Sequence, residues 1–144
     1  MSENLPIEYK RILAIDYGER RIGTALSDPL KIFSYPFKTL LNDNSIWKEL
    51  GKIILDQDVS LIVLGIPSDE DKPGSIRNKI LKFKLDLESK FKLEIKLWDE
   101  TFTSAIAFEK VLESVNKKSK RRNKGLIDNN SAAIILQEFL DKHK

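Results

Sequence analysis

Short apolar runs separated by polar turns make up the first part of the chain, a pattern typical of β-strands. The runs at 11–17 (RILAIDY) and 21–27 (RIGTALS) predict two strands joined by a hairpin. Gly18 lies in the connection, where a glycine is free to adopt a positive φ. A third strand is predicted within 31–40, near Phe37–Leu40. Because proline is unfavourable inside a strand, Pro36 does not allow the first residue of this strand to be fixed.

From residue 46 onward, the apolar positions take helical spacing and alternate with two further strands. Helical stripes begin at Ile46, near Pro73 or Ser75, near Thr103 and at about Asn129. Apolar runs at 59–65 and 93–98 predict two more strands. The order β-β-β-α-β-α-β-α-α predicts a five-stranded mixed sheet, with three antiparallel strands followed by parallel ones and helices on both faces. This is the α/β element order of the ribonuclease H-like fold.

Composition indicates a globular protein. The chain has 144 residues, of which 41% are hydrophobic and 33% charged, which suits one domain with a substantial core. We expect a flexible leader at 1–10 and a single domain over 11–144. The sequence shows no signal peptide and no apolar run long enough to span a membrane, so we expect a cytoplasmic protein.

Several catalytic chemistries are excluded by missing residue types. The chain has no cysteine, and its one histidine, His143, is the penultimate residue. This argues against thiol chemistry, Ser-His-Asp triads and Cys- or His-based metal sites. Neither of the usual glycine-rich phosphate-binding motifs is present. An enzyme of this composition would depend on carboxylates, with a hard cation such as Mg²⁺ or Mn²⁺.

Positive charge is concentrated at one place. Six basic residues occur without an acid between them: Lys117, Lys118, Lys120, Arg121, Arg122 and Lys124. The other 19 basic residues are outnumbered by 22 acidic ones, so the remainder of the chain is slightly negative. Such a patch favours a polyanionic partner, and we expect Arg20 and Arg21 at the hairpin to extend the same surface. The alternative is a solvated loop without a partner.

Three acidic positions are candidates for the chemistry. Asp16 ends a buried strand, where a charge is costly unless it is paired or binds a metal; alternatively, it pairs with Arg20 or Arg21. Asp99 and Glu100 end the last strand, and alternation allows only one of them to share a face with Asp16. Asp128 precedes an apolar stripe, and locally it is more typical of a helix N-cap.

Acids from these remote elements can converge at one sheet edge in the predicted fold. Converging carboxylates without histidine suit phosphodiester hydrolysis by two metal ions about 3.5–4 Å apart. The aromatic residues Trp47 and Trp98 are interpreted as packing residues rather than base-stacking platforms. Tyr17, which follows Asp16, could stack on a base.

Four sequence blocks together resemble the YqgF (RuvX) family. They are RILAIDYGERRIGTALSDPL, LIVLGIPSDEDKPG, KLWDETFTSAIA and KRRNKGLIDNNSAAIILQEFL, which span about Arg11 to Leu140. The family comprises bacterial ribonuclease H-like proteins, first likened to Holliday-junction resolvases and usually described as candidate nucleases for the 5′ end of pre-16S rRNA. The resemblance implies that Asp16, Glu100 and Asp128 are the catalytic, metal-binding acids, with Glu100 favoured over Asp99. Thr101 departs from the family pattern, because it replaces the arginine of the D-E-R motif.

The leading hypothesis is therefore an Mg²⁺- or Mn²⁺-dependent nuclease acting on structured RNA, in particular an rRNA precursor. A Holliday-junction resolvase acting on branched DNA keeps the same chemistry, and a stable dimer would favour it. We expect a monomer or weak homodimer. The absence of the D-E-R arginine keeps a third hypothesis open, a non-catalytic RNA- or transcription-associated binding factor. The hairpin also resembles the phosphate-binding hairpin of actin-like kinases, but those proteins need two lobes of this fold.

Overall fold

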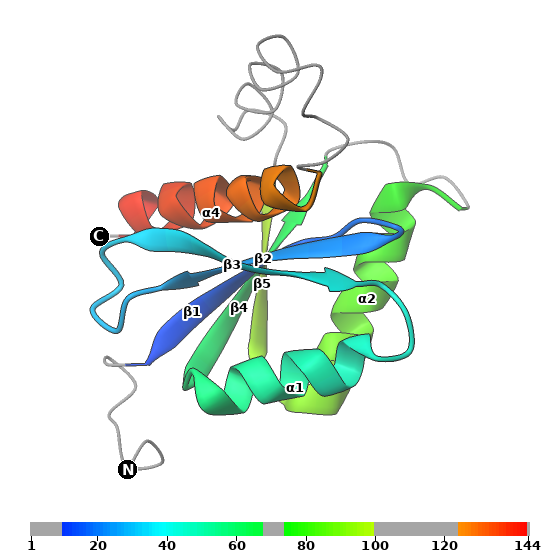
Figure 1. The fold of residues 1–144 in the computed structure, drawn as a ribbon, viewed down its shortest axis with the longest axis horizontal. Helices are drawn as coiled ribbons and strands as arrows, with labels where there is room; N and C mark the ends of the chain where they lie inside the picture. The colour runs from blue at the N-terminus through cyan, green and yellow to red at the C-terminus, as the bar shows by residue number, and fades with distance from the viewer. Residues whose placement is uncertain (1–9, 68–73, 100–123, 144) are drawn as a thin grey trace, which may run out of the picture.

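The computed structural model describes residues 10–67, 74–99 and 124–143, and only the backbone of 124–130. These residues form one mixed five-stranded sheet flanked by helices (Figure 1). The strands are β1 (Arg11–Asp16), β2 (Arg21–Ser27), β3 (Ser34–Leu41), β4 (Val59–Ile66) and β5 (Glu94–Asp99), and the helices are α1 (Ile46–Asp56), α2 (Ile76–Phe91) and α4 (Lys124–Lys142). The strand order is β3-β2-β1-β4-β5, antiparallel from β3 to β1 and parallel from β1 to β5. The predicted arrangement of strands is confirmed.

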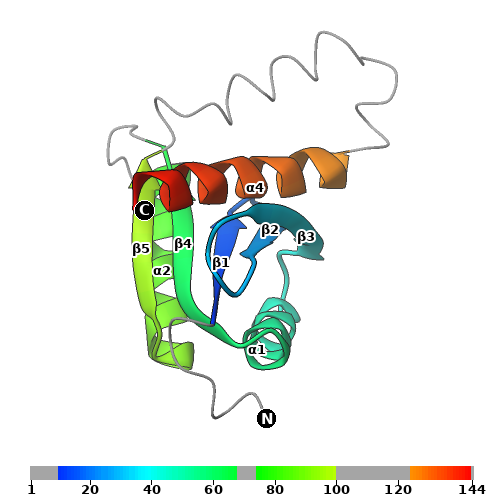
Figure 2. The same ribbon diagram turned by 90° about the vertical axis from the view of Figure 1, so that its left-hand side faces the viewer.

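The sheet separates two layers of helices. Helix α4 lies across one face, and α1 and α2 lie against the other (Figures 1 and 2). Successive side chains of a strand point to opposite faces, and β1 follows this rule. Leu13 and Ile15 belong to the core on the α1 and α2 side, whereas Ile12 and Ala14 pack with residues of α4. Because β1 is the central strand and both of its faces are buried, it is apolar without interruption until its last residue.

Strand β3 starts earlier than the residues emphasised by the sequence pattern. It begins at Ser34, and Pro36 lies within it, paired with Ala25 of β2 across a local register shift. Proline lacks an N–H donor but is tolerated in an edge strand. Since β3 is at the edge of the described sheet, Pro36 does not end it.

Helix α4 also begins earlier than predicted. It starts at Lys124 rather than near Asn129, so the last residue of the basic run is helical. Polar side chains fix the other half of α4 to β3: the Ser34 N–H donates to Gln137 Oε1 at 2.9 Å, and the Ser34 hydroxyl donates to the Ala133 carbonyl at 2.6 Å. The helix predicted near Thr103 and residues 1–9 of the leader predicted at 1–10 lie outside the described residues.

Helix α2 begins where the sequence predicts. Ser75 is its N-cap, and the serine hydroxyl accepts a hydrogen bond from the Asn78 N–H at 3.1 Å. Ile80, Phe83 and Leu87 form its buried face. In the described part of the chain, no helix combines the length and hydropathy required to cross a membrane.

Candidate active site

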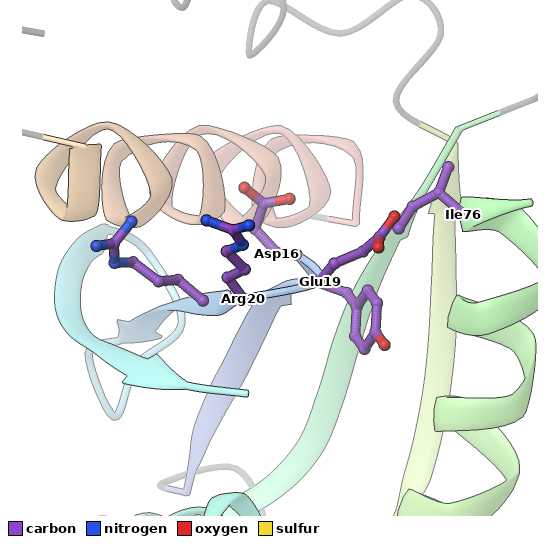
Figure 3. Close-up of a pocket in the computed structure, with 7 residues that line it drawn as sticks. Asp16, Glu19, Arg20 and Ile76 are labelled. Atoms are coloured by element: carbon purple, nitrogen blue, oxygen red, sulfur yellow. The ribbon is translucent and has the colours of Figure 1, made fainter. Parts of the chain in front are cut away.

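Asp16 is the last residue of β1 and lies on the α4 face of the sheet. Alternation continues from Ile12 and Ala14, so the Asp16 side chain points toward α4, as Figure 3 shows. The preceding residue, Ile15, is fully buried, whereas Asp16 is partly accessible. The central strand therefore carries a carboxylate to the point where the apolar interior gives way to solvent.

Glycines flank Asp16 on both neighbouring strands. Gly23 of β2 pairs directly with Asp16. On the other side, the register of Ile15 with Leu64 brings the next residue of β4, Gly65, level with Asp16. Neither of these neighbours places a side chain next to the carboxylate on the α4 face. These two glycines were not among the residues predicted for the site, although a glycine inside a strand is itself a signal of close approach by a ligand or backbone.

A pocket of about 500 Å³ opens at this end of β1. It is lined by Asp16, Tyr17, Gly18, Glu19, Arg20, Arg21 and Ile76, and we call it the Asp16 pocket. Arg20 extends on the same side of the sheet as Asp16 (Figure 3). Arg20 and Arg21 are both exposed. The structure thus brings three sequence-predicted site residues, Asp16, Arg20 and Arg21, to a single pocket.

The turn between β1 and β2 is held in place by neighbouring elements. The Asn42 side-chain amide donates to the Gly18 carbonyl at 2.8 Å, and the Asn42 N–H donates to the Arg20 carbonyl at 2.9 Å. Lys79 of α2 forms an ion pair with Glu19 at 3.2 Å. These contacts fix the backbone from which Arg20 and Arg21 extend.

Gly18 is required in this turn for a different reason from the one predicted. Its φ is not positive; among the described glycines, only Gly74 has a positive φ. Instead, a Cβ at residue 18 would lie 2.4 Å from the Arg21 carbonyl oxygen, which is too close for any side chain. Close backbone packing within the turn, rather than a left-handed conformation, therefore selects glycine.

Asp99 lies on the opposite face of the sheet from Asp16 by the alternation of β5. Trp98 packs edge-on against Phe139 of α4, with ring centroids 5.8 Å apart, whereas Ile95 belongs to the core on the α1 and α2 side. Asp99 follows Trp98 and shares the parity of Ile95. The structure does not bring Asp99 and Asp16 to one face, and Glu100 lies outside the described residues.

Asp128 is not the N-cap of the last helix. It is the fifth residue of α4, because the helix begins at Lys124. The local N-cap prediction is therefore wrong, and only the backbone of Asp128 is described. Of the basic run, Lys124 is the first helical residue, and Lys117, Lys118, Lys120, Arg121 and Arg122 lie outside the described residues.

The aromatic residues mostly serve packing. Trp47 stacks on Phe83, with centroids 5.1 Å apart, and Trp98 packs against Phe139, so the interpretation of both tryptophans is confirmed. Tyr17 contacts Phe83 at 5.0 Å in a tilted arrangement. It also lines the Asp16 pocket, so part of its side chain is accessible.

Two carboxylates outside the Asp16 pocket have lowered pKa values. Partial burial opposes ionisation of Asp28, but the N–H groups of Phe33, Ile32 and Leu30 outweigh it and hold the pKa of Asp28 below its usual value. The Ser45 hydroxyl and then its N–H likewise lower the pKa of Asp43. Within 10–67, 74–99 and 131–143, no three acidic or histidine side chains cluster as a metal site would require. A metal site containing Asp16 would need ligands from elsewhere in the chain.

The mixed sheet and its helices define a class of protein, the ribonuclease H-like fold. The structure is similar to Thermus thermophilus RuvC in complex with a Holliday junction substrate, with a TM-score of 0.58 and 11% identity over 93% of this chain and 96% of that one. It is also similar to the fowlpox virus resolvase in complex with Holliday junction DNA, with a TM-score of 0.53 and 11% identity over 92% and 98% of the two chains. At this identity the similarity concerns the fold alone.

The chain belongs to the RuvX family, whose model is described as a Holliday junction resolvase and matches residues 10–142. A relative from Azobacteroides pseudotrichonymphae is 41% identical, over 91% of this chain and 96% of its own length. One from Chlorobaculum tepidum is 35% identical, over 94% and 96%. Both are named "Putative pre-16S rRNA nuclease". The resemblance to the YqgF (RuvX) family is confirmed.

Proposed function

We propose that this protein is a metal-dependent nuclease whose site is built on Asp16. The observation that carries the proposal is the position of this carboxylate. It ends the central strand on the α4 face, lies between Gly23 and Gly65, and lines an open pocket with Arg20 and Arg21. An acid beside open space and two guanidinium groups suits a phosphodiester substrate.

Glu100 is the second acid in this proposal. Alternation along β5 supports it: Trp98 lies on the α4 face, Asp99 on the other, and the next residue would return to the face of Asp16. β5 is two strands away from β1 at the same sheet edge, or about 10 Å at the usual strand spacing. Two carboxylates at that spacing can approach one site from opposite sides.

Asp128 is the third acid, and the direction of α4 supports it. Phe139 and Leu140, near the C-terminal end of α4, line a pocket with Ile12 at the start of β1. The helix therefore runs against β1, with its N-terminal part extending toward the end of β1 that carries Asp16 (Figure 1).

Asp16, Glu100 and Asp128 would hold Mg²⁺ or Mn²⁺. Carboxylate oxygens are the ligands that these hard cations prefer, and the space beside Asp16 accommodates an ion. Bound there, the metal would activate a water molecule and stabilise the charge that develops at the phosphate. The chain's own cations, Arg20, Arg21 and the basic run, would bind the flanking phosphates and orient the strand.

The substrate that best fits the relatives is the 5′ end of pre-16S rRNA, processed in the cytoplasm. The family description favours a second candidate, a branched DNA junction. The two substrates use the same chemistry, so only a direct comparison separates them.

The test is cleavage of a labelled 16S rRNA precursor fragment and of a four-way DNA junction, each with Mn²⁺ or EDTA. Wild-type protein and Asp16→Asn are compared. We expect RNA cleavage that requires Mn²⁺ and disappears in the variant. Cleavage of the junction alone would assign the resolvase function. RNA binding without cleavage of either substrate would refute the nuclease and leave a binding factor.

A further inference from the structure

A second pocket, of about 400 Å³, lies next to the β1–β2 turn. It is lined by Tyr17, Asn42, Asp43, Asn44, Ile46, Trp47, Lys79, Lys82, Phe83 and Asp86, and we call it the Asn44 pocket. The β1–β2 turn separates it from the Asp16 pocket, and Tyr17 lines both. Two residues of the Asn44 pocket also contact the lining of the Asp16 pocket. Asn42 donates a hydrogen bond to Gly18, and Lys79 forms an ion pair with Glu19. The two pockets are therefore adjacent, and a bound chain that crosses the turn can reach both.

The Asn44 pocket has an aromatic interior. Phe83 is packed between Tyr17 and Trp47, at centroid distances of 5.0 and 5.1 Å. Trp47 is already covered by Phe83 and by the Lys90 ammonium at 5.1 Å, which leaves Tyr17 as the ring available to a base. Base stacking on an aromatic side chain contributes about 1–3 kcal/mol in single-strand binding.

The polar groups of the Asn44 pocket are arranged for a base and a phosphate together. Asn44 and Lys82 are exposed, and neither forms a side-chain hydrogen bond or ion pair with another described residue. Lys82 provides positive charge for a phosphate, and Lys79, one turn away on α2, shares its charge with Glu19 at 3.2 Å. Asp43 and Asp86 would repel a phosphate but accept hydrogen bonds from the amino and ring N–H groups of a base. The charges thus favour a base inside the pocket and its phosphate at the lysines.

We propose that the Asn44 pocket binds one unpaired nucleotide of the substrate, next to the bond positioned at Asp16. This inference rests on the proposed nuclease function, since it places one nucleic-acid strand across the β1–β2 turn, with neighbouring nucleotides in the two pockets. It also requires the nucleotide to be single-stranded, because a paired base cannot enter a pocket of this kind. The substrate would thus be cut beside a single-stranded flank rather than inside a continuous duplex.

Binding without metal tests this inference separately from catalysis. The chain has two tryptophans, so the Trp98→Phe variant keeps a single one, Trp47, which lines the Asn44 pocket. This protein is titrated in EDTA with a 12-nucleotide single-stranded RNA, the same DNA sequence, and an RNA duplex. We expect the single strands, but not the duplex, to change Trp47 emission. The single strand that binds more tightly identifies the preferred sugar, ribose or deoxyribose.

Two variants then locate the contact. Asn44→Ala and Lys82→Ala should each weaken single-strand binding by about threefold to tenfold, the equivalent of one lost hydrogen bond or phosphate contact. Lys48→Ala is the control matched in charge: Lys48 is exposed on α1 and does not line the pocket. Unchanged Trp47 emission, or losses no greater than that of Lys48→Ala, would overturn the inference. Normal binding by a protein that cuts nothing would instead refute the nuclease proposal and leave the nucleotide pocket standing.

Discussion

At the scale of single residues, the proposed site depends on what surrounds Asp16 as much as on Asp16 itself. A carboxylate directly after the buried Ile15 must keep access to water, a cation or hydrogen-bond donors. Gly23 and Gly65 fit that requirement, because neither fills the position beside Asp16 on the α4 face with a side chain. The acid was predictable from the sequence, since a charge that ends an apolar strand is visible locally. The two glycines were not, because their proximity to Asp16 depends on strand pairing.

Gly65→Ala tests the role of this open space. The added methyl group would lie beside the Asp16 carboxylate, so we expect cleavage to fall by about tenfold to a hundredfold, as for other displacements of about 1 Å at an active site. Single-turnover cleavage rates measure the effect, and thermal unfolding in parallel shows whether the variant stays folded. A folded variant that cleaves at the wild-type rate would show that the space beside Asp16 is not used.

At the scale of elements, local patterns predicted most strands and helices but not all of their ends. Asp128 was misleading, because an acid just before an apolar stripe is typical of an N-cap, yet α4 begins four residues earlier. The start of α4 carries Leu126 and Ile127, which precede the apolar stripe from Ala132 onward on which the prediction was based. Asp99 and Glu100 could not be ranked from the residues alone. Their alternation was visible, but the face that Asp16 occupies was not.

Asp28 fixes the connection between β2 and β3 and gives it a pH dependence. Its carboxylate accepts hydrogen bonds from the N–H groups of Ile32 and Phe33 at 2.7 and 2.8 Å. These bonds lower the pKa of Asp28 below 3.8 despite its partial burial. The charged form therefore stabilises the folded state above the unfolded pKa, and this contribution is lost as the pH falls through the lower folded value.

Asp28→Asn should accordingly reduce the free energy of unfolding at pH 7 by about 0.5–1 kcal/mol, a typical loss for a hydrogen bond to backbone N–H groups. The difference from wild type should shrink below pH 3.8, where Asp28 of the unfolded chain becomes protonated, and it should vanish below the lower pKa of the folded state. Urea unfolding at pH 7 and pH 3 measures both values, with a change at the exposed Glu94 of β5, Glu94→Gln, as the control. A difference that is constant with pH would contradict this role of the Asp28 charge.

At the scale of the whole molecule, the two faces of the sheet differ in their side chains. The α1 and α2 face carries the larger apolar cluster, which includes Leu13, Ile15 and Leu64. The α4 face has smaller side chains at its centre, such as Ala14 and Ala25, and ends at Asp16. We propose that the chemistry is confined to the α4 face, although both faces carry a buried apolar cluster. This proposal places the active acids on the α4 face and excludes Asp99, although Asp99 is next to Glu100 in the chain.

The most direct test compares the cleavage rates of Asp16→Asn, Glu100→Gln and Asp99→Asn under one set of conditions with Mn²⁺. Each change removes one negative charge and keeps the shape of the side chain. Asp16→Asn and Glu100→Gln should each lose at least about 100-fold, because even the outer partners of metal ligands contribute roughly 10–100-fold. Asp99→Asn should stay within a few-fold of wild type. Wild-type cleavage by Asp16→Asn, or an equal loss in Asp99→Asn, would contradict the assignment of the chemistry to the α4 face.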